Sequence, residues 1–382
     1  MKAKFSCVGL SLLAMVSVIG LSSCNGDTAG EIDIALITDS GKVNDNSFNQ
    51  FTYEGVKKFS EDNNLKCNYF DPTDYNDAGR ADAMRRAIQN GADMLVLPGY
   101  LHSPAAYTIM NEFPNVDILF IDGQPNDADG NVVMKENVSS TVYKEHEPGY
   151  LAGYAAVKEG YTKLGFAGGI EIPAVQKYGF GYLAGIIDAA TEDNVHVDVQ
   201  YTYAGTFDPS DSLRTKMDSW YGTEDVDAVF ACGGGIYASI MAAAQSKNKK
   251  WIGVDVDQYE LDKDHIITSA MKKLSESTQV SLKAWLDNGK EWPKQYAGQI
   301  ENVGAAEDLI GLPTEGASWT FTKFTKEQYN TIYNHLKTDA NYTGVSFDGK
   351  STVTLDLSKR DTSHITVHFD DTVKNKPAGL GA

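Results

Sequence analysis

The chain has 382 residues, of which 42% are apolar and 22% are charged, so it is long and apolar enough to form two ordinary globular domains. Its 52 acidic residues outnumber 33 basic residues, which gives a net charge of −19. Because no basic patch offsets this charge, the composition argues against nucleic acid as a partner.

The first 23 residues are typical of an export signal. Lys2 and Lys4 precede an apolar stretch, residues 5–21, that is short for a membrane span. The stretch ends in Leu21-Ser22-Ser23-Cys24, which resembles a bacterial lipobox. That resemblance implies a diacylated Cys24 as the first mature residue, with residues 24–31 as a tether; the alternatives are an ordinary signal peptide or an uncleaved anchor. We therefore expect a protein that is lipid-anchored on the extracytoplasmic face of the cell membrane.

Strand and helix patterns alternate from residue 32 onward. The sequence predicts strands at 32–38, 67–70, 94–97 and 117–121, and helices at 51–63, 78–90 and from about 100 to 113. Such alternation indicates a parallel sheet with helices on both faces. We assign residues 32–138, together with about 270–300, to a first lobe.

The pattern then restarts after Pro148-Gly149. Strands are predicted at 164–167, 197–203, 228–231, 251–254 and 266–270, and helices at 150–159, 174–190, 210–221, 239–246 and 275–288. Two doubly wound blocks predict an α/β fold of two lobes, with one ligand cleft between the carboxyl ends of the two sheets. Residues 139–269 and about 301–346 are assigned to the second lobe. The tail, 347–382, is an extension whose alternating runs, 353–357 and 365–369, predict half-exposed antiparallel strands.

Polar side chains follow several of these strands. Asp39, Asp122, Asp255 and Lys272 each stand at the carboxyl end of a predicted strand, which is where open α/β folds bind ligands. The loop 39–50 adds carboxylates, amides and an aromatic side chain that has no core to fill. Within it, Asp45 is either a ligand contact or a cap of the following helix.

A triple glycine, residues 233–235, lacks the Lys-Ser/Thr ending of a phosphate loop and the spacing of a dinucleotide fingerprint. Close approach of the Gly233 backbone to a ligand, or the start of a helix, is the better interpretation.

Six motifs follow one another along the chain: Asp39-x-Gly41-x-x-x-Asp45-x-Ser47-Phe48-Asn49-Gln50, Tyr150-Leu-Ala-Gly-Tyr-Ala-Ala, Gly165-Phe-Ala-Gly-Gly-Ile-x-Ile-Pro173, Gly179-Phe-Gly-Tyr-Leu-Ala-Gly185, Gly205-Thr-Phe207-Asp208 and Ile252-Gly-Val-Asp255-Val-Asp257-Gln258. In this order they resemble the basic membrane protein family of bacterial substrate-binding lipoproteins. The resemblance implies a two-lobe fold of the periplasmic-binding-protein type (type I). It also implies that the chain captures a purine nucleoside (guanosine, inosine or adenosine) and delivers it to the permease of an ABC importer.

The chemistry of a nucleoside matches the residue types at the expected cleft. Phe48 and Phe207 are the candidate walls for a purine ring, although either side chain could instead pack beneath its own loop. A carboxylate such as Asp255 accepts from two vicinal hydroxyls of a ribose, and Lys272 donates to its oxygens. The full set of candidate ligand contacts is Asp39, Asp45, Phe48, Asn49, Tyr100, Asp122, Phe207, Gly233, Asp255 and Lys272. Within this set, Tyr100 stands where the family usually has Phe.

An enzyme is not expected. None of the seven His residues has zinc-ligand spacing or stands beside a nucleophile elbow, and we predict neither a metal nor a cofactor. A nucleoside hydrolase would share the substrate, but it would need a dense acidic or metal cluster at one loop. A pentose or hexose receptor and a nucleoside-sensing signalling lipoprotein remain the alternatives. We expect a monomer, since a hinged receptor must present both lobes to its transporter.

Overall fold

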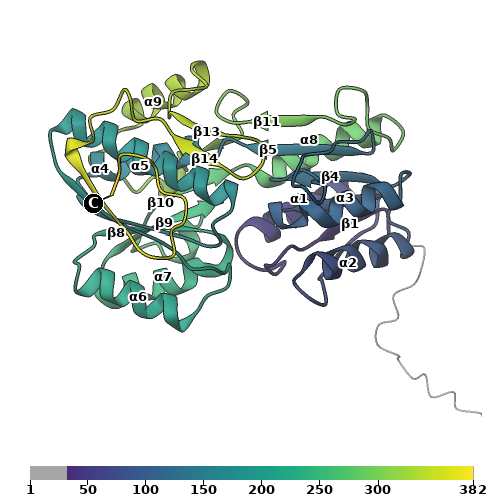
Figure 1. Cartoon of the computed structure of the whole chain (residues 1–382), viewed down its shortest axis with the longest axis horizontal. Helices are drawn as coiled ribbons and strands as arrows, with labels where there is room; N and C mark the ends of the chain where they lie inside the picture. Colours follow the sequence, from purple (N-terminus) through teal and green to yellow (C-terminus); the bar gives the residue numbers. More distant parts are fainter. Residues whose placement is uncertain (1–31, 382) are drawn as a thin grey trace, which may run out of the picture.

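The computed structural model describes residues 32–381, and in it two sheets stand side by side as two lobes (Figure 1). The first sheet contains β1 (Ile34–Ile37), β2 (Cys67–Phe70), β3 (Met94–Pro98), β4 (Asp117–Ile121), β5 (Val138–Tyr143) and β11 (Ile300–Val303). Its strand order is β11-β5-β4-β3-β1-β2, and every pairing in it is parallel. The predicted parallel sheet is thus present in the first lobe.

The second sheet has the same plan. It contains β6 (Lys163–Gly168), β7 (Val197–Tyr203), β8 (Ala228–Cys232), β9 (Lys250–Asp255), β10 (Ile266–Lys272), β12 (Ile310–Gly311) and β15 (Ile365–Phe369). The order is β12-β10-β9-β8-β6-β7-β15, and only β12 pairs antiparallel among these described strands. Both lobes are therefore doubly wound, as the alternation of elements predicts.

Side-chain alternation along β1 explains how helices cover both faces of the first sheet. Ile34 and Leu36 pack toward α1 (Phe48–Asp62) and α8 (Leu274–Asp287), whereas Ala35 and Ile37 pack toward α2 (Asp77–Gln89) and α3 (Ser103–Glu112). All four side chains are fully buried. A strand with apolar residues on both faces must lie between two layers of helices.

In the second lobe α6 (Asp211–Gly222) and α7 (Tyr237–Lys247) cover one face of the sheet, and α4 (His146–Glu159) and α5 (Pro173–Asp193) cover the other. A further helix, α9 (Lys326–Thr338), packs beside α4. Glycines bring α4 and α5 unusually close: a Cβ on Gly153 would lie 2.2 Å from the backbone oxygen of Tyr182. Small residues are required along this helix pair.

Between residues 32 and 381 the chain crosses between the lobes three times, after β5, after β10 and after β11. The sequence predicts boundaries between the lobes at 138/139 and 300/301, whereas in the structure the first lobe extends a few residues further at both places. β5 extends to Tyr143 and pairs with β4, and β11 extends to Val303 and pairs with β5, so both strands belong to the first sheet. Hydrophobic pattern alone does not reveal which sheet a strand joins.

The tail is only in part what the sequence predicts. β13 (Val345–Phe347) and β14 (Val353–Leu355) form the expected antiparallel pair. β15, however, pairs parallel with β7 at the edge of the second sheet, so the prediction of an antiparallel strand there is wrong, and this part of the tail belongs to the second lobe. Alternation marks a half-exposed strand but not the direction of its partner.

Between residues 32 and 381, none of the helices has the length and apolar character that a membrane crossing requires. The proposed signal, tether and Cys24 lie outside the described residues.

Candidate functional site

A narrow cavity lies between the lobes, at the carboxyl ends of both sheets, and all ten predicted site residues line it. The first lobe contributes Asp39, Asp45, Phe48, Asn49, Tyr100 and Asp122, and the second contributes Phe207, Gly233, Asp255 and Lys272. Because the ten come from segments up to 233 residues apart in the sequence, their convergence depends on the relative placement of the two lobes. Their roles toward a ligand remain predictions.

Asp45 caps α1 and also faces the cavity. Its carboxylate accepts hydrogen bonds from the backbone N–H groups of Ser47 at 2.9 Å, Asn49 at 3.1 Å and Gln50 at 3.2 Å. Burial raises the pKa of Asp45 to about 6, although these bonds oppose the shift. The helix-cap interpretation is thus supported by the geometry, and the position of the residue also leaves it open to a ligand.

Asp39 and Asn49 form a second polar corner of the cavity. Asp39 Oδ1 accepts from the backbone N–H of Ser40 at 2.6 Å and from Asn49 Nδ2 at 3.4 Å. Gly99 makes room for this carboxylate, since a Cβ there would lie 2.5 Å from Asp39 Oδ2. Within the described chain Asn49 Oδ1 is buried without a hydrogen-bond partner. An unpaired buried acceptor costs about 1–3 kcal/mol, so a donor that reaches it would gain this energy.

Asp122 and Asp255 occupy equivalent positions in the two lobes, directly after β4 and at the end of β9. Both have left-handed backbone conformations, with φ of 59° for Asp122 and 67° for Asp255. Residues other than glycine adopt this conformation at a cost, and such strain gathers at ligand-binding sites. The turn aims both carboxylates across the cleft.

Lys272 joins these two carboxylates. Its ammonium group forms a close ion pair with Asp122, lies 3.3 Å from Asp255 Oδ1 and lies 4.0 Å from Glu145 Oε1. Burial opposes the charge, but the three carboxylates outweigh it and raise the pKa of Lys272. The ammonium also lies 4.7 Å from the centre of the Phe48 ring, which is within cation–π range.

The two predicted aromatic walls come from opposite lobes. Phe48 begins α1, and Phe207 lies in the loop after β7. Phe207 rests against the glycines of the second lobe: a Cβ on Gly233, whose φ is 142°, would lie 2.9 Å from the Phe207 ring. Gly233 therefore makes room for an aromatic side chain, a reason that the glycine run alone did not reveal.

Besides the Asp122–Lys272 ion pair, three hydrogen bonds that involve the loop before α1 join the lobes across the cleft. Ser47 Oγ donates to Asp255 Oδ2 at 2.6 Å, Asn46 Nδ2 donates to Tyr237 Oη at 3.0 Å, and Gln258 Nε2 donates to the backbone oxygen of Asn46 at 3.1 Å. The loop before α1 thus supplies both cavity residues and interlobe contacts, and the structure represents a closed arrangement.

Sequence reasoning missed several residues around the cavity. Ile172, Val175 and Tyr178 line it from the start of α5, and Glu145 lies behind Lys272. Ser47 is part of a motif that was recognised, but its contact with the other lobe was not foreseen. An acidic residue just after a strand was the available signal for Glu145. No group of three or more potential metal ligands is present between residues 32 and 381.

The chain is similar to several known proteins. A family model described as "ABC transporter substrate-binding protein PnrA-like" (Bmp) matches residues 32–341. The ABC transporter nucleoside-binding protein BmpA of Lactococcus lactis is 30% identical over 277 residues, which cover 67% of this chain and 75% of that protein. Basic membrane protein A of Borreliella burgdorferi is 29% identical over 309 residues, which cover 79% of this chain and 86% of that protein.

The fold is shared with solved solute-binding proteins. A solute-binding protein of an ABC transporter system from Aeropyrum pernix K1 superimposes with a TM-score of 0.67 at 20% identity, and the match covers 82% of this chain and 88% of that one. The periplasmic-binding-protein type of fold is thereby confirmed, and so is the resemblance to the basic membrane proteins. The family consists of substrate-binding proteins rather than enzymes. The chain therefore belongs to the Bmp family of PnrA-like substrate-binding proteins of ABC transporters.

Proposed function

We propose that this protein captures a purine nucleoside in the cleft between its lobes and delivers it to the permease of an ABC importer. The observation that carries the proposal is the meeting of Phe48 and Phe207, from opposite lobes, with the Asp122–Lys272–Asp255 group in one cavity. A purine nucleoside has a flat apolar base and a ribose with vicinal hydroxyls. The cavity offers groups suited to each half.

The two aromatic rings suit the faces of the base. Stacking of a base on an aromatic side chain contributes about 1–3 kcal/mol in single-stranded nucleic acid binders. Because Phe48 and Phe207 belong to different lobes, a base that contacts both gains this energy fully only when the lobes are closed. A ligand of this shape therefore favours closure by population shift.

Polar groups suit the edge of the base and the ribose. Asn49 Oδ1, which lacks a partner within the described chain, is an acceptor for an N–H group on the base edge. Asp122 and Asp255 accept from ribose hydroxyls, and Lys272 donates to a ribose oxygen. The nucleoside-binding name of the Lactococcus lactis relative supports the same ligand class.

The protein acts, in this proposal, from the outer face of the cell membrane. The lipobox-like Leu21-Ser22-Ser23-Cys24 would place a diacylated Cys24 at the membrane, and residues 25–31 would tether a monomeric two-lobe body. Mass spectrometry of the N-terminal peptide tests this step: a diacylglyceryl group on Cys24 is expected. An unmodified chain that begins elsewhere would contradict the lipid anchor and leave the ligand proposal intact.

Isothermal titration tests the ligand. The protein is unfolded and refolded to remove any copurified ligand and then titrated with purine and pyrimidine nucleosides, free bases and ribose. Tight binding of a purine nucleoside, without binding of ribose and without formation of free base, is the expected result. Binding of a free pentose or hexose together with silence for every nucleoside would overturn the proposal in favour of a sugar receptor. Release of free base would instead reveal a hydrolase.

A further inference from the structure

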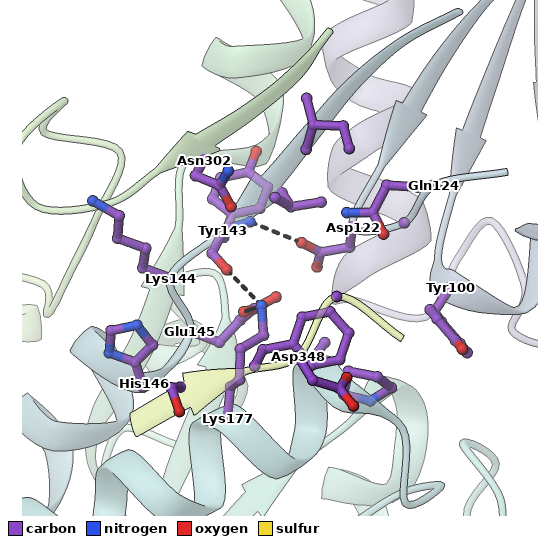
Figure 2. Close-up of a pocket in the computed structure, with 18 of the residues that line it drawn as sticks. Tyr100, Asp122, Gln124, Tyr143, Lys144, Glu145, His146, Lys177, Asn302 and Asp348 are labelled. Atoms are coloured by element: carbon purple, nitrogen blue, oxygen red, sulfur yellow. Dashed lines mark hydrogen bonds and ion pairs between the residues drawn. The ribbon is translucent and has the colours of Figure 1, made fainter. Parts of the chain in front are cut away.

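A second cavity, of about 700 Å³, lies beside the ligand cavity and shares Tyr100, Asp122 and Ala174 with it (Figure 2). Its other walls come from the crossing segments, residues 142–146 and 300–302, and from the turn of the β13–β14 hairpin. In Figure 2 Lys177 and Glu145 point toward each other in the middle of this space, and Tyr100 lies at its far side. The hairpin therefore adjoins both the hinge and the ligand site.

The base of the hairpin is fixed to the second lobe. β13 and β14 pack on α5, and Asn375 Nδ2 donates to the backbone oxygen of Val353 at 2.8 Å and to Gln176 Oε1 at 3.3 Å. Phe347 lies beneath the Lys177 ammonium, 5.9 Å from the nitrogen to the ring centre. When the second lobe moves, these contacts carry the base of the hairpin with it.

The tip of the hairpin reaches the first lobe, as the yellow segment of Figure 1 shows. Tyr100 Oη donates to the backbone oxygen of Lys350 at 3.1 Å, and Lys350 Nζ donates to Asn131 Oδ1 at 2.8 Å. One turn of the chain thus makes two contacts with the opposite lobe.

The tip is preorganised by Asp348. Its Oδ1 atom accepts from the backbone N–H groups of Thr352 at 3.0 Å, Lys350 at 2.8 Å and Ser351 at 2.9 Å. These bonds lower the pKa of Asp348 to about 2, so the carboxylate stays charged and the turn keeps its shape. A preorganised turn loses little entropy when it contacts the first lobe.

The hairpin also touches the charged network behind the ligand. The Lys177 ammonium, which covers Phe347, forms a close ion pair with Glu145 and donates to the backbone oxygen of Tyr143 at 2.8 Å. Glu145 in turn lies near Lys272. The tip of the hairpin therefore contacts Tyr100, which lines the ligand cavity. The base contacts Lys177, which is linked to the cavity residue Lys272 through Glu145.

We propose that the hairpin, residues 345–355, is a strap that connects the two lobes non-covalently beside the three chain crossings. The strap stabilises the closed arrangement of the lobes, with Lys350 as its positioning residue. The strap lies beyond residues 32–341, the part that the family model matches. Its effect on nucleoside release rests on the proposed function, whereas its effect on lobe closure does not.

The contacts of the strap are exposed, and each contributes a modest amount to closure. The net contribution of one hydrogen bond corresponds to about a threefold to tenfold change in the equilibrium between the open and closed arrangements of the lobes. Lys350→Met keeps the aliphatic stem and removes the bond to Asn131. Tyr100→Phe keeps the ring and removes the bond to the Lys350 backbone. The double variant releases the tip.

Hydrogen exchange of the full chain in detergent micelles, without ligand, tests the strap. The loop 45–50 forms the interlobe hydrogen bonds of Asn46 and Ser47, so its amides report on closure. They are expected to exchange about threefold to tenfold faster in each single variant and faster still in the double variant. Lys359→Ala, an exposed change elsewhere in the tail, is the matched control and leaves the loop unaffected. The thermal midpoint is expected to stay within a few degrees, which separates a loss of closure from a loss of folding.

Unchanged exchange of the loop in the folded double variant would overturn the strap. Faster exchange without any nucleoside binding would instead uphold the strap and reject the proposed function. With guanosine, inosine or adenosine bound, whichever titration selects, Lys350→Met is expected to raise the dissociation rate by the same factor as it raises the exchange rate. A raised exchange rate with an unchanged dissociation rate would restrict the strap to the unliganded protein and contradict its role in release.

Discussion

Ser47 of the first lobe donates a hydrogen bond of 2.6 Å to the carboxylate of Asp255 in the second lobe, and the pair is buried. Asp255 also faces Lys272 through its other oxygen. A carboxylate has about four lone-pair positions, so ribose hydroxyls can bind to Asp255 without displacing Ser47. The bond therefore strengthens the closed arrangement both with and without a ligand.

Ser47→Ala is expected to weaken nucleoside binding about tenfold, because closure loses a hydrogen bond to a charged group. Titration calorimetry provides the measurement. Ser40→Ala is the matched control in the same loop, since the Ser40 hydroxyl has no hydrogen-bond partner in the described part of the chain. Equal affinities of the two variants would show that the Ser47 bond does not contribute to closure.

Phe48→Ala is expected to weaken binding by one to two orders of magnitude, following the stacking energy of a base on an aromatic ring. Phe48→Leu retains apolar volume but offers no aromatic face, so it separates stacking from simple packing. We expect the leucine variant to bind nearly as weakly as the alanine variant. If leucine restored full affinity while both proteins stayed folded, Phe48 would be a packing residue rather than a wall of the site.

Gly153→Ala is expected to destabilise the protein by about 1–3 kcal/mol, the usual cost of overpacking. The new methyl group would lie 2.2 Å from a backbone oxygen of α5, and a backbone atom cannot swing aside as a flexible side chain can. Gly222→Ala, at an open helix end whose nearest neighbour would be 3.6 Å away, is the control. Urea unfolding compares the two, and a neutral Gly153→Ala would contradict the tight contact of α4 with α5.

His102→Gln tests whether the buried His102 makes the folded protein less stable at acid pH. Burial lowers the pKa of His102 from 6.5 to about 3, and its Nε2 atom donates to the backbone oxygen of Ile37 at 2.9 Å. Because the unfolded chain takes up a proton near pH 6.5 and the folded chain does not, His102 costs stability as the pH falls below 6.5 and down toward 3, about 1.4 kcal/mol per unit. Glutamine keeps a donor and cannot be protonated. The variant should therefore lose less stability between pH 7 and pH 5 in urea unfolding, and an identical loss would contradict this role.

The sequence allowed both lobes and ten of the residues that line the cavity to be predicted, because strand ends are readable from apolar runs. Asp122, Asp255 and Lys272 each follow such a run, and the carboxyl ends of parallel strands meet at one edge. Which residue of the other lobe lies opposite each of them depends on how the two lobes are placed. No local sequence pattern encodes that placement. The Ser47–Asp255 bond joins positions 208 residues apart and was missed for this reason.

The tail shows a second limit. The alternation in Ile365–Phe369 marks a half-exposed strand correctly, but the strand joins β7 in parallel because the intervening chain returns along α5. Lys350 had no distinguishing pattern at all, since its importance comes from a tip that reaches across the hinge. Contacts between distant segments, rather than secondary structure, were the part that the sequence left open.

The balance of charge in the ligand cavity has a consequence for what the protein rejects. Four carboxylates, Asp39, Asp45, Asp122 and Asp255, face one ammonium group, that of Lys272. A phosphate group that entered this space would meet more repulsion than attraction, and its dehydration would go uncompensated. Under the proposed function, the cleft acts as a charge filter that admits a neutral nucleoside and turns away the corresponding nucleotide. A nucleotide would have to lose its phosphate group before this protein could bind it.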